Sequence, residues 1–69
     1  MQETYTYHIE VQGEVDESDF NKSSPLRVSI ARADVETTLL TLHADQSGLV
    51  GLIRHLHHQG IAILSLSRA

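Results

Sequence analysis

Hydrophobic and polar residues alternate along the first part of the chain, from Tyr5 to Val15. The apolar members of this segment share the odd positions: Tyr5, Tyr7, Ile9, Val11 and Val15. A period of two places neighbouring side chains on opposite faces of a β-strand. The pattern therefore predicts a half-buried strand over Tyr5–Val15. We expect this strand to bend at Gly13, where its apolar side lacks a side chain.

Two further strands are predicted in the middle of the chain. Pro25 suits the first position of a strand, and apolar and polar residues alternate after it as far as Ala31. A run rich in Thr and Leu, Val35–Ala44, predicts the third strand. The polar segment Asp16–Ser24 between the first two strands is interpreted as a connection, with Phe20 tucked beneath it as an anchor.

The third predicted strand does not alternate cleanly. Leu40 and Leu42 lie on the face where the earlier strands carry charged residues. If that face were open to water, two leucines would be exposed. The sequence therefore predicts either a bulge that shifts the register or a second subunit that covers both leucines.

One amphipathic helix is predicted after Asp45. Asp45 is a favourable N-cap, and Gly60 occupies the position of a left-handed C-terminal residue. Ile61 is placed for the hydrophobic contact with Leu56 that accompanies such an ending. Between the two caps, one buried stripe follows the i, i+3, i+4, i+7 spacing: Leu49, Leu52, Ile53 and Leu56.

The final segment, Ile61–Arg68, is apolar on both faces at its start, which is typical of an inner or covered strand. The predicted elements are strand, strand, strand, helix, strand, and the fold class is α+β. The helix returns the chain to its starting edge, so the third and fourth strands should point the same way. We expect a mixed four-stranded sheet in the order 3-2-1-4, with the last strand parallel to the first and the helix on one face. The order 1-2-3-4 is the alternative.

Length and composition favour a protein that gains stability from a partner. The chain has 69 residues and no cysteine, so we expect a single domain over residues 1–69 without disulfides. Small domains of this kind often gain burial by forming oligomers. The formal net charge is −4, and residues 1–20 contain six acids and no Lys or Arg. Nucleic acid is not an expected partner, because binding phosphates needs a basic surface.

The sequence also indicates the cellular compartment in which the protein is expected. Its start lacks the basic and apolar segments of a signal peptide, and no apolar run is long enough to cross a bilayer. We therefore expect a cytoplasmic protein without a membrane partner.

The helix and the last strand together carry a recognisable pattern. The first part reads Asp45-Gln46-Ser47-Gly48-Leu49-Val50-Gly51-Leu52-Ile53, and the second reads Gly60-Ile61-Ala62-Ile63-Leu64-Ser65-Leu66-Ser67-Arg68. This half of the chain resembles small, functionally uncharacterised bacterial proteins, in which an Asp-Gln pair caps a helix with a Leu-x-Gly-Leu-Leu stretch and the final strand reads Leu-Leu-Ser-Val-x-Arg. The chain departs from that pattern at Gly48, where alanine is more usual, and in its three helix histidines. The resemblance implies the fold and no activity, and it singles out Gln46, Gly51, Ser65 and Arg68.

Five histidines are the most unusual candidates for chemistry. His55 and His58 lie three positions apart on the predicted helix and are weak candidates for a transition-metal site. Zinc needs three or four converging ligands, and the sequence has neither a cysteine nor a His-Glu-x-x-His run. We therefore expect solvent-exposed imidazoles near the negative end of the helix, with no metal and no cofactor.

His8, Glu10 and Glu14 form a second candidate group, because they alternate along one face of the first predicted strand. A general acid or base needs such a side chain in a pocket beside a partner. Rows of this kind are more often the solvated face of a sheet, and a domain of this size has little room for an enclosed pocket. We therefore expect no enzymatic activity.

These observations favour a non-enzymatic interaction or assembly module that forms a homodimer through its sheet or the edge of the sheet. Leu40, Leu42 and Val50 are the predicted interface residues. The alternative is a domain that binds a small ligand, or weakly binds a metal, at a cleft between two subunits. His8, Glu10 and the helix histidines would line that cleft.

Overall fold

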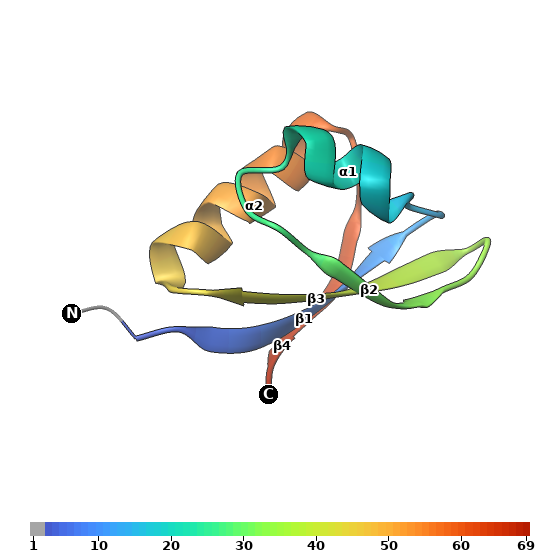
Figure 1. The fold of residues 1–69 in the computed structure, drawn as a ribbon. Helices are drawn as coiled ribbons and strands as arrows, with labels where there is room; N and C mark the ends of the chain where they lie inside the picture. Colours follow the sequence, from blue (N-terminus) through green and yellow to red (C-terminus); the bar gives the residue numbers. More distant parts are fainter. Residues whose placement is uncertain (1–2) are drawn as a thin grey trace.

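The computed structural model describes residues 3–69. Its elements follow the chain in this order: β1 (Tyr5–Gln12), α1 (Glu17–Ser23), β2 (Ser29–Ala33), β3 (Thr37–Ala44), α2 (Gln46–His58) and β4 (Ile63–Arg68). The four strands form one sheet, and both helices lie on the same face of it (Figure 1). The α+β class agrees with the prediction, but the structure has one helix more than expected.

The sheet has the strand order β2-β3-β1-β4, and each neighbouring pair is antiparallel. The predicted mixed sheet, the order 3-2-1-4 and the alternative 1-2-3-4 are therefore wrong. The reason is α1, which carries the chain across the helical face and leaves the place beside β1 for β3. Each helix thus connects two strands separated by a third, as in the ferredoxin-like arrangement of β-α-β-β-α-β elements. β3 and β4 do point the same way, as predicted, because both run antiparallel to β1.

Helix α1 lies where the sequence predicted a connection. The Asp16 side chain caps the helix by accepting a hydrogen bond of 2.9 Å from the Asp19 amide. Phe20 is buried, as predicted, and it is the one residue of α1 that is. A helix with a single buried position leaves no hydrophobic period in the sequence, which explains why this element was missed.

Strand β1 ends at Gln12, before the predicted end. Gly13 has a φ of 92°, a left-handed conformation that favours glycine, and its amide donates to the Glu36 carbonyl oxygen at 2.6 Å. The hydroxyl of buried Thr38 donates to the Gly13 carbonyl oxygen at 2.8 Å and accepts a hydrogen bond from the Val15 amide at 3.2 Å. The chain therefore turns away from the sheet at Gly13, where the sequence predicted a bend.

Strands β2 and β3 both start later than the alternation predicted, at Ser29 and Thr37. The Asn21 side chain accounts for the start of β2. Its amide nitrogen donates to the Val28 carbonyl oxygen at 3.0 Å, and its oxygen accepts from the Val28 amide at 2.9 Å. Because α1 satisfies both backbone groups of Val28, that residue does not join the ladder of the sheet.

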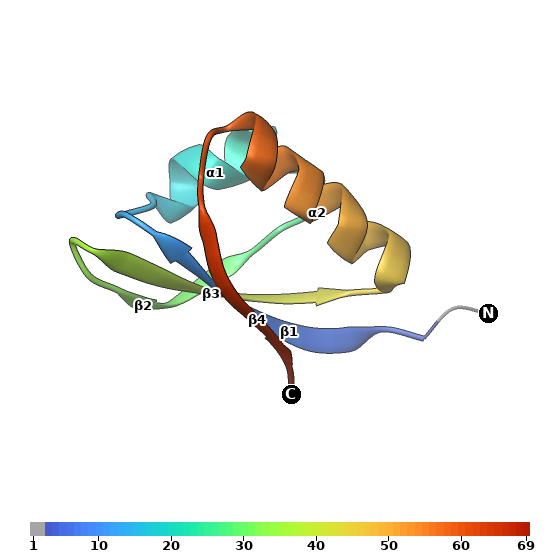
Figure 2. The same cartoon turned by 180° about the vertical axis from the view of Figure 1, so that it is seen from behind.

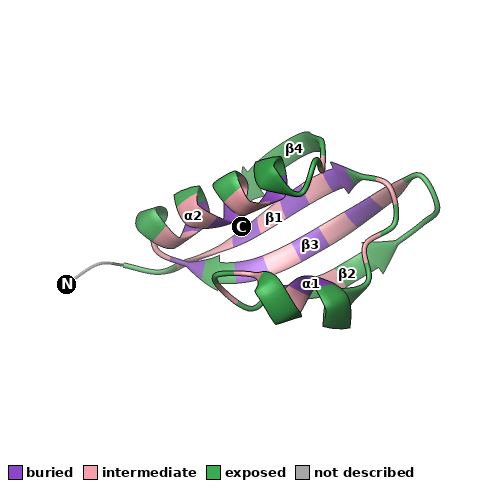
Figure 3. Cartoon of the chain, turned by 90° about the horizontal axis from the view of Figure 1, so that it is seen from above, coloured by how far each residue is buried: buried purple, intermediate pink, exposed green. Residues whose placement is uncertain are grey.

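The core lies between the sheet and the helices, where the facing residues of β1 and β3 are buried (Figure 3). Leu40 pairs with Ile9, and Leu42 pairs with Tyr7. Cross-strand partners lie on the same face of a sheet, so both leucines point toward the helices. Leu40 is 0% exposed and Leu42 is 2% exposed. The prediction that these two leucines contact a second subunit is therefore wrong, because the core of this chain already covers them.

Both ends of helix α2 are as predicted. The Asp45 carboxylate accepts a hydrogen bond of 2.7 Å from the Gly48 amide. At the other end Gly60 has a φ of 73°, its amide donates to the His57 carbonyl oxygen, and the Ile61 amide donates to the Leu56 carbonyl oxygen, each at 3.0 Å. These two bonds form a complete Schellman motif. Three members of the predicted stripe are buried, and the fourth is half-buried: Leu49, Leu52 and Leu56, then Ile53.

Strand β4 forms one edge of the sheet, and among the four described strands its partner is β1. All six of its residues are exposed, and Figure 2 shows the strand, in red, on the near side of the molecule. The prediction of an inner or covered strand is therefore wrong for the single chain. The segment is apolar on both faces, as the sequence indicated, but all six residues of β4 are exposed in this structure.

Candidate functional site

Exposed apolar side chains gather along β4 and the flank of α2 beside it. The large hydrophobic residues that are most exposed there are Ile63 (37%), Val50 (44%), Leu66 (45%) and Leu64 (50%). Half-buried Ile53 and Ile61 complete this surface. We call these six residues the β4 strip. A contiguous apolar surface on a small protein marks a place of interaction more often than a scattered residue does.

The outer edge of β4 presents backbone groups that pair with no strand in the described part of the chain, residues 3–69. The Ala69 amide donates to the Thr6 carbonyl oxygen at 2.9 Å, and Ser67 is in register with His8. Hydrogen-bonded pairs alternate along an antiparallel ladder, so Ser67 directs its N–H and C=O toward β1. Leu66 and Arg68 therefore direct theirs outward, where they can pair with another strand.

The opposite edge of the sheet, β2, is better protected. The strand is short, a bulge lies between Ile30 and Arg32, and the Arg32 guanidinium pairs with the Glu10 carboxylate at 3.4 Å. A bulge and a charged residue both discourage pairing at an edge. β4 also has a bulge, at Leu64, but it carries no charged residue before Arg68. Of the two edges, β4 is the one suited to pairing.

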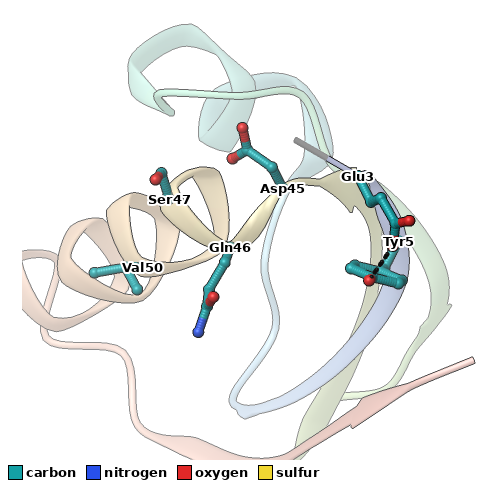
Figure 4. Close-up of a pocket in the computed structure, with 6 residues that line it drawn as sticks. All are labelled: Glu3, Tyr5, Asp45, Gln46, Ser47 and Val50. Carbon is teal, nitrogen blue, oxygen red and sulfur yellow. Dashed lines mark hydrogen bonds between the residues drawn. The ribbon is translucent and has the colours of Figure 1, made fainter. Parts of the chain in front are cut away.

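A groove of about 620 Å³ lies at one end of the β4 strip, between the start of β1 and the first turn of α2 (Figure 4). Its lining residues are Glu3, Tyr5, Asp45, Gln46, Ser47 and Val50. Both charged residues of this lining are carboxylates, so we call it the acidic groove. Val50, the third predicted interface residue, lies at this groove and is exposed.

Tyr5 contacts both Glu3 and Arg68 at the wall of the acidic groove. Its hydroxyl donates a hydrogen bond of 2.6 Å to the Glu3 carboxylate, which is drawn as a dashed line in Figure 4. The Arg68 guanidinium lies 4.5 Å from the centre of the Tyr5 ring, in cation–π geometry. The hydrogen bond to Glu3 raises the pKa of Tyr5 above its ordinary value, because ionising the phenol would place two negative charges together. This cluster ties the end of β4 to the start of β1.

A second groove, of about 450 Å³, lies at the other end of the strip, between the last turns of α2 and the start of β4. Its apolar lining includes Ile53, Ile61 and Ile63, and its titratable lining is Arg54, His57 and His58. Every titratable side chain of this groove is a base, so we call it the basic groove. The two grooves thus have charged linings of opposite sign.

The face of the sheet away from the helices is polar. His8 Nδ1 lies 3.2 Å from the Thr41 hydroxyl, and His43 Nδ1 lies 2.9 Å from the Thr6 hydroxyl. Glu10, the second member of the predicted row, pairs with Arg32 instead of with a histidine. Glu14 lies beyond the turn at Gly13 and outside β1. The structure therefore does not assemble His8, Glu10 and Glu14 into one row.

His55 and His58, the weak metal candidates, have different neighbours. The His55 ring packs edge-on against Phe20 at 5.3 Å, and its Nε2 lies 3.5 Å from the Ser23 hydroxyl of α1. His58 lines the basic groove. Within residues 3–69 no three side chains of the His, Cys, Asp or Glu type are grouped so that they could hold a metal ion.

The residues singled out by resemblance fall into two groups. Gln46 lines the acidic groove, and Arg68 stacks on Tyr5 beside it. Ser65 is exposed on β4, and a Cβ at Gly51 would meet no atom within 4 Å.

Sequence reasoning missed Ile63, Leu64 and Leu66 as surface residues. Their apolar pattern was visible, but an uncovered edge strand and a covered inner strand share that pattern.

Comparison with known proteins gives one match. A family described as "Domain of unknown function (DUF8691)" matches residues 6–67. No curated protein and no solved structure matches the chain. Neither helix in residues 3–69 is long and apolar enough to cross a membrane.

Proposed function

Because the chain belongs to the DUF8691 family, a family of unknown function, we propose its role from its structure: it is a non-enzymatic assembly module that forms a homodimer through β4. The observation that carries this proposal is the exposure of β4. Its six residues are all exposed, its outer backbone groups have no strand partner within residues 3–69, and three of its side chains are large and apolar. An exposed, apolar edge strand favours pairing with another strand.

A second copy of the chain suits this edge. A domain of 69 residues buries a small core, and pairing at β4 would extend the sheet to eight strands, four from each copy. Leu66 of one copy would then pack beside Leu66 of the other, and the β4 strip would be removed from water. Oligomers of identical chains commonly use one surface twice in this way.

The polar face of the sheet supports a role without catalysis. Its histidines are occupied by hydrogen bonds to Thr6 and Thr41, and Glu10 is occupied by Arg32. Among the contacts of residues 3–69, neither histidine is paired with a carboxylate that would orient it as a general base.

Sedimentation velocity over a range of protein concentrations tests the proposal. We expect the native chain to sediment as a dimer at micromolar concentration, and Leu66→Lys to sediment as a monomer, because it would place an ammonium group in the paired surface. Ser29→Lys is the matched control. Ser29 is exposed and lies on β2, at the opposite edge of the sheet from β4, so this variant should remain dimeric.

Two results would contradict the proposal: a native chain that stays monomeric throughout the concentration range, or a dimer that Leu66→Lys leaves intact. Thermal unfolding of both lysine variants separates loss of pairing from loss of the fold. Leu66 is 45% exposed in the single chain, so its replacement should leave a cooperative transition.

A second candidate is ligand binding in the basic groove, which combines an apolar lining with His57 and His58. Titration with Zn²⁺ or Ni²⁺ followed by thermal unfolding tests the metal form of this idea, since an ion that binds only the folded chain must raise the melting temperature. A melting temperature that does not change with metal concentration would argue against it.

A further inference from the structure

We infer that the two copies pair with their β4 strands antiparallel, so that the acidic groove of each copy faces the basic groove of the other. This inference rests on the proposed function and specifies how the partner is oriented. It follows from the position of the two grooves along β4, from the symmetry of strand pairing and from the charges that line each groove.

The two grooves lie at opposite ends of β4. Ile63, the first residue of the strand, lines the basic groove. Arg68, the last residue, stacks on Tyr5, which lines the acidic groove. Helix α2 connects them, because Val50 belongs to the acidic groove and Ile53 to the basic groove. The β4 strip therefore runs between a negative end and a positive end.

Symmetry leaves two ways to pair a strand with its own copy. In antiparallel pairing the twofold axis is perpendicular to the sheet, so both α2 helices lie on the same face and their flanks meet. In parallel pairing the axis runs along the strands, so the two helical layers lie on opposite faces. Only the antiparallel arrangement covers Val50 and Ile53, the helical part of the strip, together with Leu66.

Antiparallel pairing also matches the charges. It brings the start of one β4 beside the end of the other, so Glu3 and Asp45 of one copy approach Arg54 of the second copy. Because the dimer is symmetric, this contact between carboxylates and Arg54 occurs twice. Arg68 is a cation at the acidic end, and its guanidinium is engaged with the Tyr5 ring. Complementary charges at the rim of an interface set the orientation of the partners and the rate of association.

Leu66 is the natural centre of this pairing. Its N–H and C=O point away from β1, so two copies of Leu66 on the twofold axis would exchange both hydrogen bonds. Ser65 cannot be that centre, because its backbone groups face Glu10 of β1. Centring on Leu66 also places this exposed side chain in the middle of the apolar surface.

A charge-swap experiment tests the orientation. Arg54→Glu alone places carboxylates in both grooves, and Glu3→Lys alone places cations in both, so each variant should form homodimers more weakly than the native chain. In an equimolar mixture, the dimer with one copy of each variant regains opposite charges at both contacts. Random pairing would give as much mixed dimer as both homodimers together. Native mass spectrometry should instead show the mixed dimer in about fivefold excess over the two homodimers combined, a preference within the range of exposed ion pairs.

Arg27→Glu and Glu14→Lys form the matched control pair, because both residues are exposed and line neither groove. Their mixture should give the statistical share of mixed dimer. If the Arg54→Glu and Glu3→Lys mixture also gives the statistical share while Leu66→Lys still abolishes the dimer, the orientation is wrong and the proposed function stands. If the native chain is monomeric, both are wrong.

Discussion

Gly48 and Gly51 lie three positions apart in α2 and have different surroundings. A Cβ at Gly51 would meet no atom within 4 Å, whereas a Cβ at Gly48 would lie 3.2 Å from each of three side chains: Ala44, Asp45 and Leu26. The close approach of α2 to its neighbours therefore explains a glycine at Gly48. Nothing in the structure requires one at Gly51.

This difference predicts that alanine substitutions at the two glycines change the free energy of unfolding differently. Gly51→Ala should raise the free energy of unfolding by about 1 kcal/mol, because alanine is favoured over glycine by that amount within a helix. Gly48→Ala should gain less or lose stability, because its methyl group crowds the Asp45 cap. Urea unfolding of both variants at one protein concentration measures the difference. An equal gain for both would show that the packing around Gly48 does not matter.

Tyr5 provides a prediction for alkaline pH. The hydrogen bond to Glu3 raises the pKa of Tyr5, so the folded chain holds the phenol proton more tightly than the unfolded chain does. The stability from this contact is therefore complete below the unfolded pKa of about 10 and is lost as the pH rises through the folded pKa. Titration of tyrosinate absorbance in a Tyr7→Phe background should show a raised midpoint that Glu3→Gln lowers. A midpoint that Glu3→Gln leaves unchanged would assign the shift to another cause.

Among the elements, α1 determines the topology although it contributes only one buried side chain. Asn21 fixes the helix to the chain before β2 through two hydrogen bonds to Val28. Asn21→Ala should lower the free energy of unfolding by about 1–3 kcal/mol, because it leaves both backbone groups of Val28 without these partners. Chemical denaturation measures this loss. Ser18→Ala, an exposed change in the same helix, should stay within about 0.5 kcal/mol of the native chain. An equal loss for both variants would show that the two bonds of Asn21 to Val28 are not the cause.

The same elements show how far the sequence could predict the fold. Both ends of α2 were predicted, because Asp45 and Gly60 act through local bonds that depend on a few neighbouring residues. The strand order was not predicted, because it depends on whether the chain between β1 and β2 crosses the sheet. That crossing is made by α1, whose single buried residue, Phe20, carries no periodic signal. The predicted strand order was therefore wrong because the sequence pattern did not indicate one short helix, α1.

The candidate site was predicted only in part, for a related reason. The sequence indicated an apolar surface for a partner, and Val50 is exposed as expected. The leucines of β3 were assigned to the partner because their face was judged from charges on other strands. The register with Ile9 and Tyr7 places them in the core instead. The exposed apolar residues come from β4, whose pattern cannot distinguish a buried strand from an uncovered edge.

At the scale of the whole molecule, the structure has one helical face, one polar face and two unequal edges (Figures 1 and 3). The helices cover the core, and the polar face is occupied by contacts such as the pair of Glu10 with Arg32. The β2 edge is interrupted by a bulge and a charge, whereas the β4 edge is open and apolar. Whether β4 is paired in solution therefore decides the function proposed for this molecule.

Amide hydrogen exchange at Leu66 tests that claim most directly, because this N–H points outward from the sheet. The neighbouring Ser67 amide, which faces β1, is the internal control. We predict that protection of the Leu66 amide rises with protein concentration, while the Ser67 amide is protected at every concentration. A Leu66 amide that exchanges rapidly at all concentrations would contradict the pairing of β4.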